Sequence, residues 1–153
     1  MMAALLRNAP GTYVLWLHAD SVRTVTVGAR GPVTLQPGWY AYVGSARGPG
    51  GLRARVQRHA RRQKNAHWHI DYLREALTLR TVWLAYDASS HECTWAAALR
   101  THPVATSPRK GLGSSDCACP THFIRWNAPM PSRTLLSDAS AAASLTVHRW
   151  MPT

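Results

Sequence analysis

Acidic residues are scarce in this sequence. Its 153 residues include 7 Asp or Glu against 18 Lys or Arg, which gives a formal net charge of +11 with histidine neutral and a pI of about 10.8. A surface of this charge attracts polyanions, and charge alone makes nucleic acid the first candidate partner and an acidic membrane surface the second. A basic surface without any binding role is the alternative.

Long hydrophobic runs and paired cysteines are also missing. No apolar stretch approaches the roughly 20 residues that a membrane-spanning helix needs, and residues 3–6 are too short for the core of a signal peptide. Three cysteines, an odd number, fit a reducing compartment better than a disulfide framework. These absences argue against the membrane-spanning and secreted classes, and we expect a cytoplasmic protein without a membrane partner.

The composition that remains is that of a folded domain. Hydrophobic residues make up 46% of the chain, which is enough for a core, and the length suits one domain. We expect residues 1–10 as a lead-in and residues 11–127 as the domain. Residues 128–153, rich in Ser, Ala and Pro, are expected to form an irregular or partly mobile tail.

Local patterns predict the elements of an α+β domain. Short apolar runs rich in β-branched and aromatic residues predict strands, and apolar residues at spacings of three or four predict helices. The expected strands are 11–17, 22–27, 33–35, 39–43, 81–86 and 123–126, and the expected helices are 52–64, about 69–77 and 89–100. We therefore expect a small, mainly antiparallel central sheet flanked by helices, similar to an α/β sandwich.

Several weak signals follow one another in order along this chain. The tripeptides GTY (residues 11–13) and YVG (residues 42–44) fall on predicted strands, and a glycine-containing loop follows the second. The next predicted helix carries Arg55 and His59, whose spacing of four places them on one helix face. Glu92 lies in the first turn of a later predicted helix.

This order of G-x-Y, Y-V-G, loop, L-x-x-R-x-x-x-H and a helix-borne Glu resembles the GIY-YIG nuclease superfamily. That superfamily includes homing endonucleases, some restriction enzymes and the incision subunit of bacterial nucleotide excision repair. Residues 42–59 (YVGSARGPGGLRARVQRH) are similar to the homing-enzyme form of the motif. Residues 67–73 (HWHIDYL) and 113–123 (GSSDCACPTHF) resemble a compact, poorly characterised branch, the Uri-type endonucleases. The resemblance covers about residues 11–126.

The resemblance implies a metal-dependent endonuclease that hydrolyses phosphodiester bonds in nucleic acid. DNA is the expected substrate, and DNA repair or processing is the expected role. Glu92 would bind one divalent cation, Mg²⁺ or Mn²⁺, because a carboxylate with water and phosphate suits a hard cation. Arg55 would neutralise charge on the phosphate in the transition state. Tyr13 would orient or deprotonate the attacking water, with Tyr42 hydrogen-bonding beside it and His59 as an auxiliary contact. A phenol pKa near 10 suits a base only if Arg55 and the metal lower it.

Two departures from the compact pattern affect these assignments. Residues 14–41, 28 in number, separate the two tyrosines, which implies an inserted hairpin at about residues 18–37. Two extra residues also lie within 48–51, so Arg53 is an alternative to Arg55. Arg55 is favoured because His59 then falls in its family position.

The positive charge is concentrated on the predicted helix 52–64. Six of the eighteen basic residues lie within residues 53–64, and we expect this helix to contact phosphates. Besides Arg55, the expected nucleic-acid contacts are Arg53, Arg58, Arg61, Arg62 and Lys64.

Each of these residues also has an ordinary structural interpretation. Ser89 and Glu92 have the S-x-x-E spacing of a capping box, which would explain Glu92 without a metal. Tyr13 and Tyr42 would be core aromatics, and the arginines would form a solvated helix face. The alternative functions are a catalytically silent nucleic-acid-binding module with the same fold, and a zinc-stapled interaction domain.

The zinc alternative rests on a C-x-C-x-x-H pattern. Cys117, Cys119 and His122 offer three of the four ligands that a structural zinc site needs, and Cys93 or another histidine would be the fourth. A reduced cysteine pair under a loop is the simpler interpretation.

The segment HWHID is polar for a packed segment. His67, His69 and Asp71 in this segment, together with Asp116, could line the catalytic face, but the sequence assigns them no role. Trp68, next to polar residues, could stack on bases or pack in the core.

Overall fold

The computed structural model describes residues 5–61, 65–114, 119–141 and 143–152. Within these residues the main sheet consists of β1 (Gly11–Ala19), β4 (Gly38–Ala46), β5 (Thr78–Tyr86), β6 (Ala105–Thr106), β7 (Phe123–Trp126) and β8 (His148–Trp150). A two-stranded sheet consists of β2 (Arg23–Thr26) and β3 (Pro32–Leu35), joined by the 3-10 turn η1 (Gly28–Arg30). The helices are α1 (Gly51–Ala60), α2 (His69–Leu73), α3 (Glu92–Arg100) and α4 (Ser137–Ala141), and the 3-10 turn η2 (Arg133–Leu136) precedes α4.

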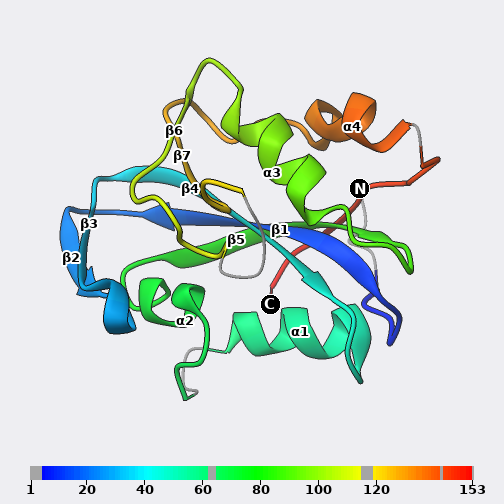
Figure 1. Cartoon of the computed structure of the whole chain (residues 1–153), viewed down its shortest axis with the longest axis horizontal. Coiled ribbons are helices and arrows are strands. Elements are labelled where there is room, and N and C mark those ends of the chain that lie inside the picture. The colour runs from blue at the N-terminus through cyan, green and yellow to red at the C-terminus, as the bar shows by residue number, and fades with distance from the viewer. Residues whose placement is uncertain (1–4, 62–64, 115–118, 142, 153) are drawn as a thin grey trace.

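The main sheet has the strand order β6-β7-β4-β1-β5-β8, and all its neighbouring strands are antiparallel. Helices α1 and α2 lie on one side of the sheet, and α3 and α4 lie on the other (Figure 1). The expected α+β sandwich with an antiparallel central sheet is confirmed. None of the helices in the described part of the chain is long and apolar enough to cross a membrane.

Strand β1 separates two hydrophobic cores. Successive side chains of a strand point to opposite faces, so a strand that is covered on both faces is apolar throughout. Tyr13, Leu15 and Leu17 belong to the core under α1 and α2, whereas Val14 and Trp16 belong to the core under α3. This double burial explains the uninterrupted apolar run at the start of the sequence.

The inserted hairpin is also confirmed, as β2 and β3 between β1 and β4. Its residues alternate in burial: Val25, Val33 and Leu35 join the core under α1 and α2, whereas Thr24 and Thr34 are exposed. The insertion therefore extends one of the two cores without interrupting the β1–β4 pairing on which the central sheet depends.

All three predicted helices are shorter in the structure. Helix α1 ends at Ala60 because Arg61 takes an extended conformation, and α2 ends at Leu73 rather than Leu77. Arg62 and Lys64 lie outside the described residues. The prediction of a capping box formed by Ser89 and Glu92 is wrong. Helix α3 begins at Glu92 itself, and His91 precedes it without a side-chain cap.

The C-terminal segment is more regular than expected. The prediction of an irregular tail is wrong for residues 133–141 and 148–150, where η2, α4 and β8 form. Leu136 is buried in the core under α3, and β8 pairs with β5 so that Trp150 lies opposite Val82. Isolated apolar residues among Ser, Ala and Pro produce no periodicity, although tertiary packing orders them.

Candidate active site

Side chains from four elements meet at a cleft of about 290 Å³. Tyr13 comes from β1, Tyr42 from β4, Arg55 from α1 and Glu92 from the first residue of α3. The other lining residues are Val43, Gly44, Ser45, Arg47, Gly48, Trp68 and Gly113. Four of the five residues in the predicted catalytic set therefore line one cleft, and the fifth, His59, contacts the first of them.

The pairing of β1 with β4 places Tyr13 opposite Gly44. A Cβ atom at Gly44 would lie 2.4 Å from the hydroxyl oxygen of Tyr13, which is far inside van der Waals contact. The Tyr13 side chain therefore crosses the backbone of β4 at a point where only glycine leaves room.

His59 lies behind Tyr13, on the buried face of α1. Its Nε2 atom is 2.7 Å from the Tyr13 hydroxyl, and both side chains are at most 2% exposed. The rings of Tyr42 and Trp68 surround the same imidazole, with centroid distances of 6.3 and 5.8 Å. The aromatic rings therefore fix the orientation of His59 toward Tyr13.

Burial controls the ionisation of the two tyrosines. It raises the pKa of Tyr13 above its ordinary value, and the nearby Arg55, through its charge and a hydrogen bond, offsets only part of this effect. Burial and the neighbouring Tyr13 likewise raise the pKa of Tyr42. Without a bound cation, both phenols are protonated at neutral pH, so Arg55 alone does not produce the lowered pKa that a tyrosinate base requires.

Arg55 is held in place from two sides. Its Nη1 atom donates to the carbonyl oxygen of Ser45 at 2.9 Å, and its guanidinium carbon lies 4.5 Å from the centre of a Trp68 ring. A guanidinium has five N–H donors, so an arginine with this backbone contact still has donors for a phosphate. Arg53, the alternative, is exposed on the same helix and does not line the cleft.

Glu92 is held through both carboxylate oxygens. The hydroxyl of Ser45 donates to Oε1 at 2.9 Å, and Nδ1 of His122 lies 2.7 Å from Oε2. The start of α3 is tied to β1, because the backbone N–H of His91 donates to Oγ1 of Thr12 at 2.9 Å. Burial disfavours protonation of His122, but the hydrogen bonds of Glu92 and Cys119 outweigh it and raise the pKa of His122.

The donor set fits a hard divalent cation. Oε1 of Glu92 accepts from Ser45 and Oε2 lies 2.7 Å from Nδ1 of His122, so each oxygen still has a lone pair for an ion. The side chain is 23% exposed and lines the cleft. One carboxylate together with water and phosphate oxygens is the usual coordination of Mg²⁺ in phosphoryl chemistry. Glu92 is therefore able to hold such an ion at the edge of the cleft.

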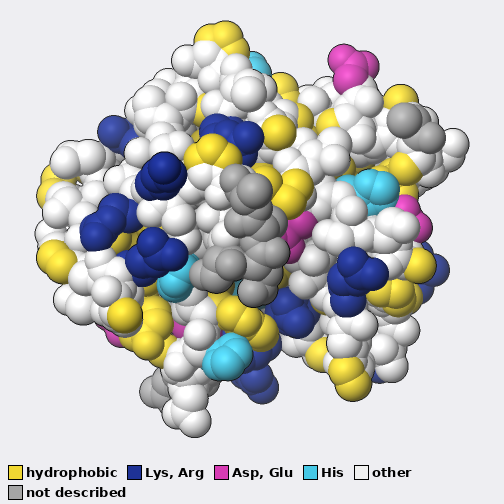
Figure 2. Space-filling model, in the orientation of Figure 1, with side chains coloured by type: hydrophobic (Ala, Val, Ile, Leu, Met, Phe, Trp, Pro, Cys, Tyr) yellow, Lys and Arg dark blue, Asp and Glu magenta, His cyan; other side chains and the backbone are white. Residues whose placement is uncertain are grey.

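The predicted basic contacts differ in their surroundings. Arg53 and Arg61 are exposed, whereas Arg62 and Lys64 lie outside the described residues. Arg58 forms a two-pronged pair with Asp71, with both nitrogen–oxygen distances 2.9 Å. In Figure 2, many Lys and Arg side chains and only a few acidic ones are visible on the face shown.

Asp71, which had no role from the sequence, organises the segment before α2. Its Oδ2 atom accepts the backbone N–H groups of His67 and Trp68, each at 2.8 Å, in addition to Arg58. Burial disfavours the charged carboxylate, but these hydrogen bonds outweigh it and lower the pKa of Asp71. The result is a fixed position for Trp68, which in turn packs against Arg55.

His69 has a comparable role on the other side of the cleft. Its Nδ1 atom accepts the backbone N–H of Gly113 at 2.9 Å. Gly113 has a positive φ of 73°, and a Cβ there would lie 2.7 Å from the Tyr42 ring. His69 and Asp71 thus support the cleft walls, whereas Asp116 lies outside the described residues.

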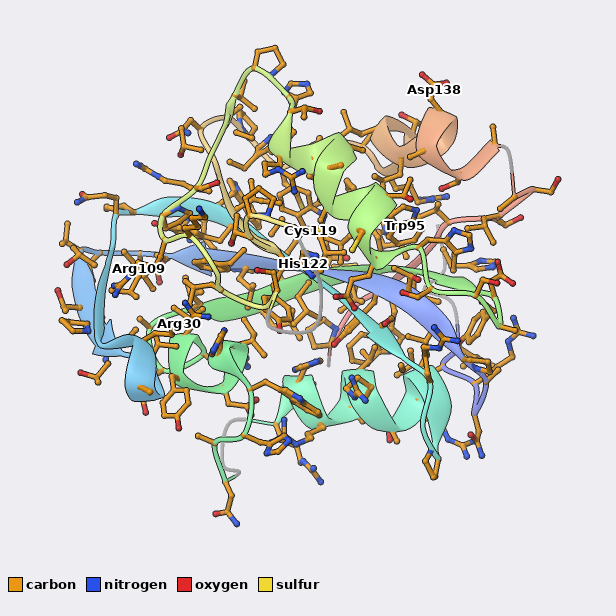
Figure 3. The ribbon with its side chains drawn as sticks, in the orientation of Figure 1. Arg30, Trp95, Arg109, Cys119, His122 and Asp138 are labelled. Carbon is orange, nitrogen blue, oxygen red and sulfur yellow. The ribbon has the colours of Figure 1, made fainter. Side chains whose placement is uncertain are left out.

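The predicted zinc ligands also converge in part. Cys93, Cys119 and His122 each offer one ligand atom, and these three atoms all lie within 4.8 Å of one another. Figure 3 places Cys119 and His122 next to each other beneath α3. Cys117 lies outside the described residues.

Sequence reasoning missed the partners that hold Glu92. Ser45 directly follows the Y-V-G tripeptide, and its side chain and backbone contact Glu92 and Arg55 respectively. His122 was considered as a zinc ligand only, because its contact with Glu92 spans 30 positions and no local spacing indicates it.

Comparison with known proteins gives one family. Residues 12–145 match the model of the family described as "Domain of unknown function DUF123". The match begins within β1 and includes all of α1 and α3, so it covers the five residues of the predicted catalytic set. No curated protein matches the chain, and no solved structure does.

Proposed function

We propose that this chain, which belongs to the DUF123 family of domains of unknown function, is a metal-dependent endonuclease acting on nucleic acid. The proposal rests above all on one observation: Tyr13, Arg55 and Glu92 come from distant parts of the sequence and line a single cleft. A phenol, a guanidinium and a carboxylate in one cleft are suited to water attack on a phosphodiester, which matches the resemblance to GIY-YIG nucleases.

In this proposal Glu92 holds the divalent cation. Ser45 and His122 fix the two carboxylate oxygens, so the carboxylate needs no rearrangement to receive the ion. Bound Mg²⁺ or Mn²⁺ would supply Lewis-acid stabilisation of the scissile phosphate and of the leaving oxygen.

Arg55 binds the scissile phosphate. The contacts with the Ser45 carbonyl and the Trp68 ring orient its guanidinium before substrate arrives. Because charge accumulates on the phosphate oxygens during attack, a guanidinium held in this way stabilises the transition state more than the ground state.

Tyr13 and His59 position the water and accept its proton. The hydroxyl of Tyr13 and Nε2 of His59 are hydrogen-bonded at 2.7 Å. In this proposal Nε2 is the acceptor, so the phenolic O–H donates to it and the phenolic oxygen accepts from the attacking water. As the water attacks, its proton passes to the Tyr13 oxygen and the phenolic proton passes to His59. Because the two proton transfers are concerted, no free tyrosinate forms, which the burial of Tyr13 makes unfavourable.

Charge on the surrounding surface supports binding of a polyanion. Arg47 lines the cleft, Arg53 and Arg61 are exposed on and after α1, and the net charge of the chain is +11. We take DNA as the substrate because of the family resemblance. We take the cytoplasm as the site of action because the odd number of cysteines fits a reducing compartment.

A nucleic-acid-binding module without catalysis is the second candidate. This candidate is favoured by the contacts of Ser45 and His122 with the two carboxylate oxygens of Glu92, because these contacts compensate the charge of Glu92 without a metal. The two candidates share the basic surface and differ in whether phosphodiester bonds break.

Cleavage assays distinguish them. The protein is incubated in Mg²⁺, Mn²⁺ or EDTA with four substrates: plasmid DNA, single-stranded DNA, branched DNA and RNA. Binding of the protein to each substrate is measured in parallel. We expect metal-dependent cleavage that Glu92→Gln abolishes while binding persists. Glu75→Gln removes the same charge from an exposed position outside the cleft and serves as the matched control. Binding without cleavage on every substrate would favour the module, and metal-independent cleavage would contradict the mechanism.

A further inference from the structure

We propose that Cys93, Cys119 and His122 form a second metal site, for a thiophilic cation of the Zn²⁺ type, directly behind Glu92. The three side chains come from two elements that pack together: Cys93 is the second residue of α3, and the other two precede β7. This site does not depend on the proposed nuclease activity.

The distances are close to those of a formed site. Zn–S and Zn–N bonds of about 2.3 and 2.0 Å in a tetrahedron place a sulfur and a nitrogen ligand about 3.6 Å apart. The observed distance from Cys93 Sγ to His122 Nε2 is 3.9 Å, and all three ligand atoms lie within 4.8 Å of one another. Small side-chain adjustments therefore suffice to bind an ion.

The ligand types select the metal. Two thiolates and an imidazole are soft or borderline ligands, which suit Zn²⁺, whereas Mg²⁺ and Ca²⁺ prefer oxygen ligands. The ion of this site thus differs in kind from the ion proposed at Glu92. Among the described residues, three ligands occupy three positions of a tetrahedral Zn²⁺ site, and the exposure of Cys93 gives the ion access.

The orientation of His122 supplies an independent argument. Its Nδ1 atom lies 2.7 Å from Oε2 of Glu92, so its Nε2 atom is directed to Cys93. A metal-binding histidine typically donates its other ring N–H to a carboxylate, which fixes the tautomer and strengthens the ligand. Glu92 and His122 have this arrangement before any ion is present.

The backbone around His122 is rigid. Its N–H donates to the carbonyl of Leu112 at 2.8 Å, its carbonyl accepts from Val43 at 3.0 Å, and its side chain is fully buried. Because one imidazole joins the two sites, binding of the thiophilic ion fixes the carboxylate of Glu92 in the cleft.

Metal analysis of the purified protein tests the site. We expect about one zinc per chain, and with Co²⁺ a thiolate-to-metal charge-transfer band together with the visible bands of tetrahedral coordination. Cys93→Ser and Cys119→Ser should lose both signals. Glu92→Ala should keep the ligands but bind zinc about 10–100-fold more weakly in competition with a chelator, because the orienting carboxylate is lost. Glu75→Ala, an exposed acidic position elsewhere, should bind like the unmodified chain.

Several results would overturn the proposal. One is that the protein contains no stoichiometric zinc and also shows no cobalt–thiolate band. A second is that both cysteine variants bind zinc with the affinity of the unmodified chain. A third is that Cys93 and Cys119 form a disulfide in the metal-free protein. Unchanged zinc affinity in Glu92→Ala would refute the role of the carboxylate. Circular dichroism verifies folding, and Cys93→Ser is decisive because Cys93 is exposed and its replacement leaves the core intact.

Discussion

Nε2 of His59 lies 2.7 Å from the hydroxyl of Tyr13, although the two residues are 46 positions apart. The contact joins α1 to the central strand β1 through a buried polar pair. In a buried environment such a pair must remain satisfied, since a lone hydroxyl or imidazole nitrogen there costs about 1–3 kcal/mol. The pair is therefore both a structural link and the proposed route for the proton.

Removing the Tyr13 hydroxyl tests that route. We expect Tyr13→Phe to reduce the cleavage rate by about 10²–10⁴-fold, the usual contribution of general acid–base catalysis, with little change in nucleic-acid affinity. Tyr40→Phe removes a hydroxyl from the same sheet, where it donates to the Gln36 carbonyl, and should leave the rate unchanged. Single-turnover cleavage measures both, and an unimpaired Tyr13→Phe enzyme would refute the transfer through Tyr13.

Arg55 and Arg53 compete for the phosphate-binding role, and lysine substitutions separate them. Arg55→Lys keeps the charge but loses the planar fork and its contacts with Ser45 and Trp68, so we expect cleavage to fall about tenfold or more. Arg53→Lys changes an exposed side chain and should have little effect on the rate. The reverse order of the two rates would assign the role to Arg53.

Gly44 and Gly48 both line the cleft but differ in the space around them. Gly44→Ala would place a methyl group 2.4 Å from the Tyr13 oxygen, and we expect it to lower the free energy of unfolding by about 1–3 kcal/mol and to displace the phenol. A Cβ at Gly48 meets nothing within 4 Å, so Gly48→Ala is the control. Urea unfolding compares the two, and equal stabilities would contradict the close approach.

Asp71 should make the free energy of unfolding decrease as the pH falls into the acid range. Its folded pKa lies below the unfolded value of about 3.9, so its stabilisation is present above that pH and is lost as the pH falls through the folded pKa. Asp71→Asn weakens the pair with Arg58 and should cost about 2 kcal/mol at neutral pH, with a smaller difference from the unmodified protein in acid.

Asp138→Asn is the matched control for this measurement. Asp138 is exposed on α4, which lies on the opposite side of the sheet from α2, the helix that carries Asp71 (Figure 1). Replacement of Asp138 should leave stability nearly unchanged at every pH. Asp138 itself is labelled in Figure 3. A constant difference between Asp71→Asn and the unmodified protein from neutral to strongly acid pH would contradict the assignment of the acid dependence to Asp71.

Salt dependence measures the phosphate contacts. Each neutralised phosphate contributes about −0.9 to the slope of log affinity against log salt concentration on duplex DNA. The double variant Arg53→Ala and Arg61→Ala should therefore flatten the slope by about 2 units if both exposed arginines contact phosphate. An unchanged slope would show that neither Arg53 nor Arg61 contacts phosphate.

The sequence predicted what depends on local pattern. The apolar run of β1, the spacing of Arg55 and His59, and the short apolar runs at residues 22–27 and 33–35 each express a local preference, and each led to an element that the structure contains. The ordered motif also identified Tyr13, Tyr42, Arg55 and Glu92, which the fold brings to one cleft.

The sequence did not predict what depends on register and tertiary packing. The hydroxyl of Ser45 reaches Glu92 only because β4 and the start of α3 lie together, and β8 exists only because β5 offers it an edge. The S-x-x-E spacing of Ser89 and Glu92 was misleading for the same reason: the tie between His91 and Thr12 sets the start of α3 at Glu92.

The two outer strands of the central sheet have only two and three residues, β6 at one edge and β8 at the other. An unprotected strand edge is a template on which another chain can add, and short edge strands are one of the ways in which natural sheets prevent such growth. The nine-residue strands β1, β4 and β5 are all inside these two edges. A second copy of the chain, or a growing fibre, therefore meets short edge strands at both ends of the described sheet. Strand β1, which pairs with β4 on one side and β5 on the other, offers it no free edge while the fold is intact.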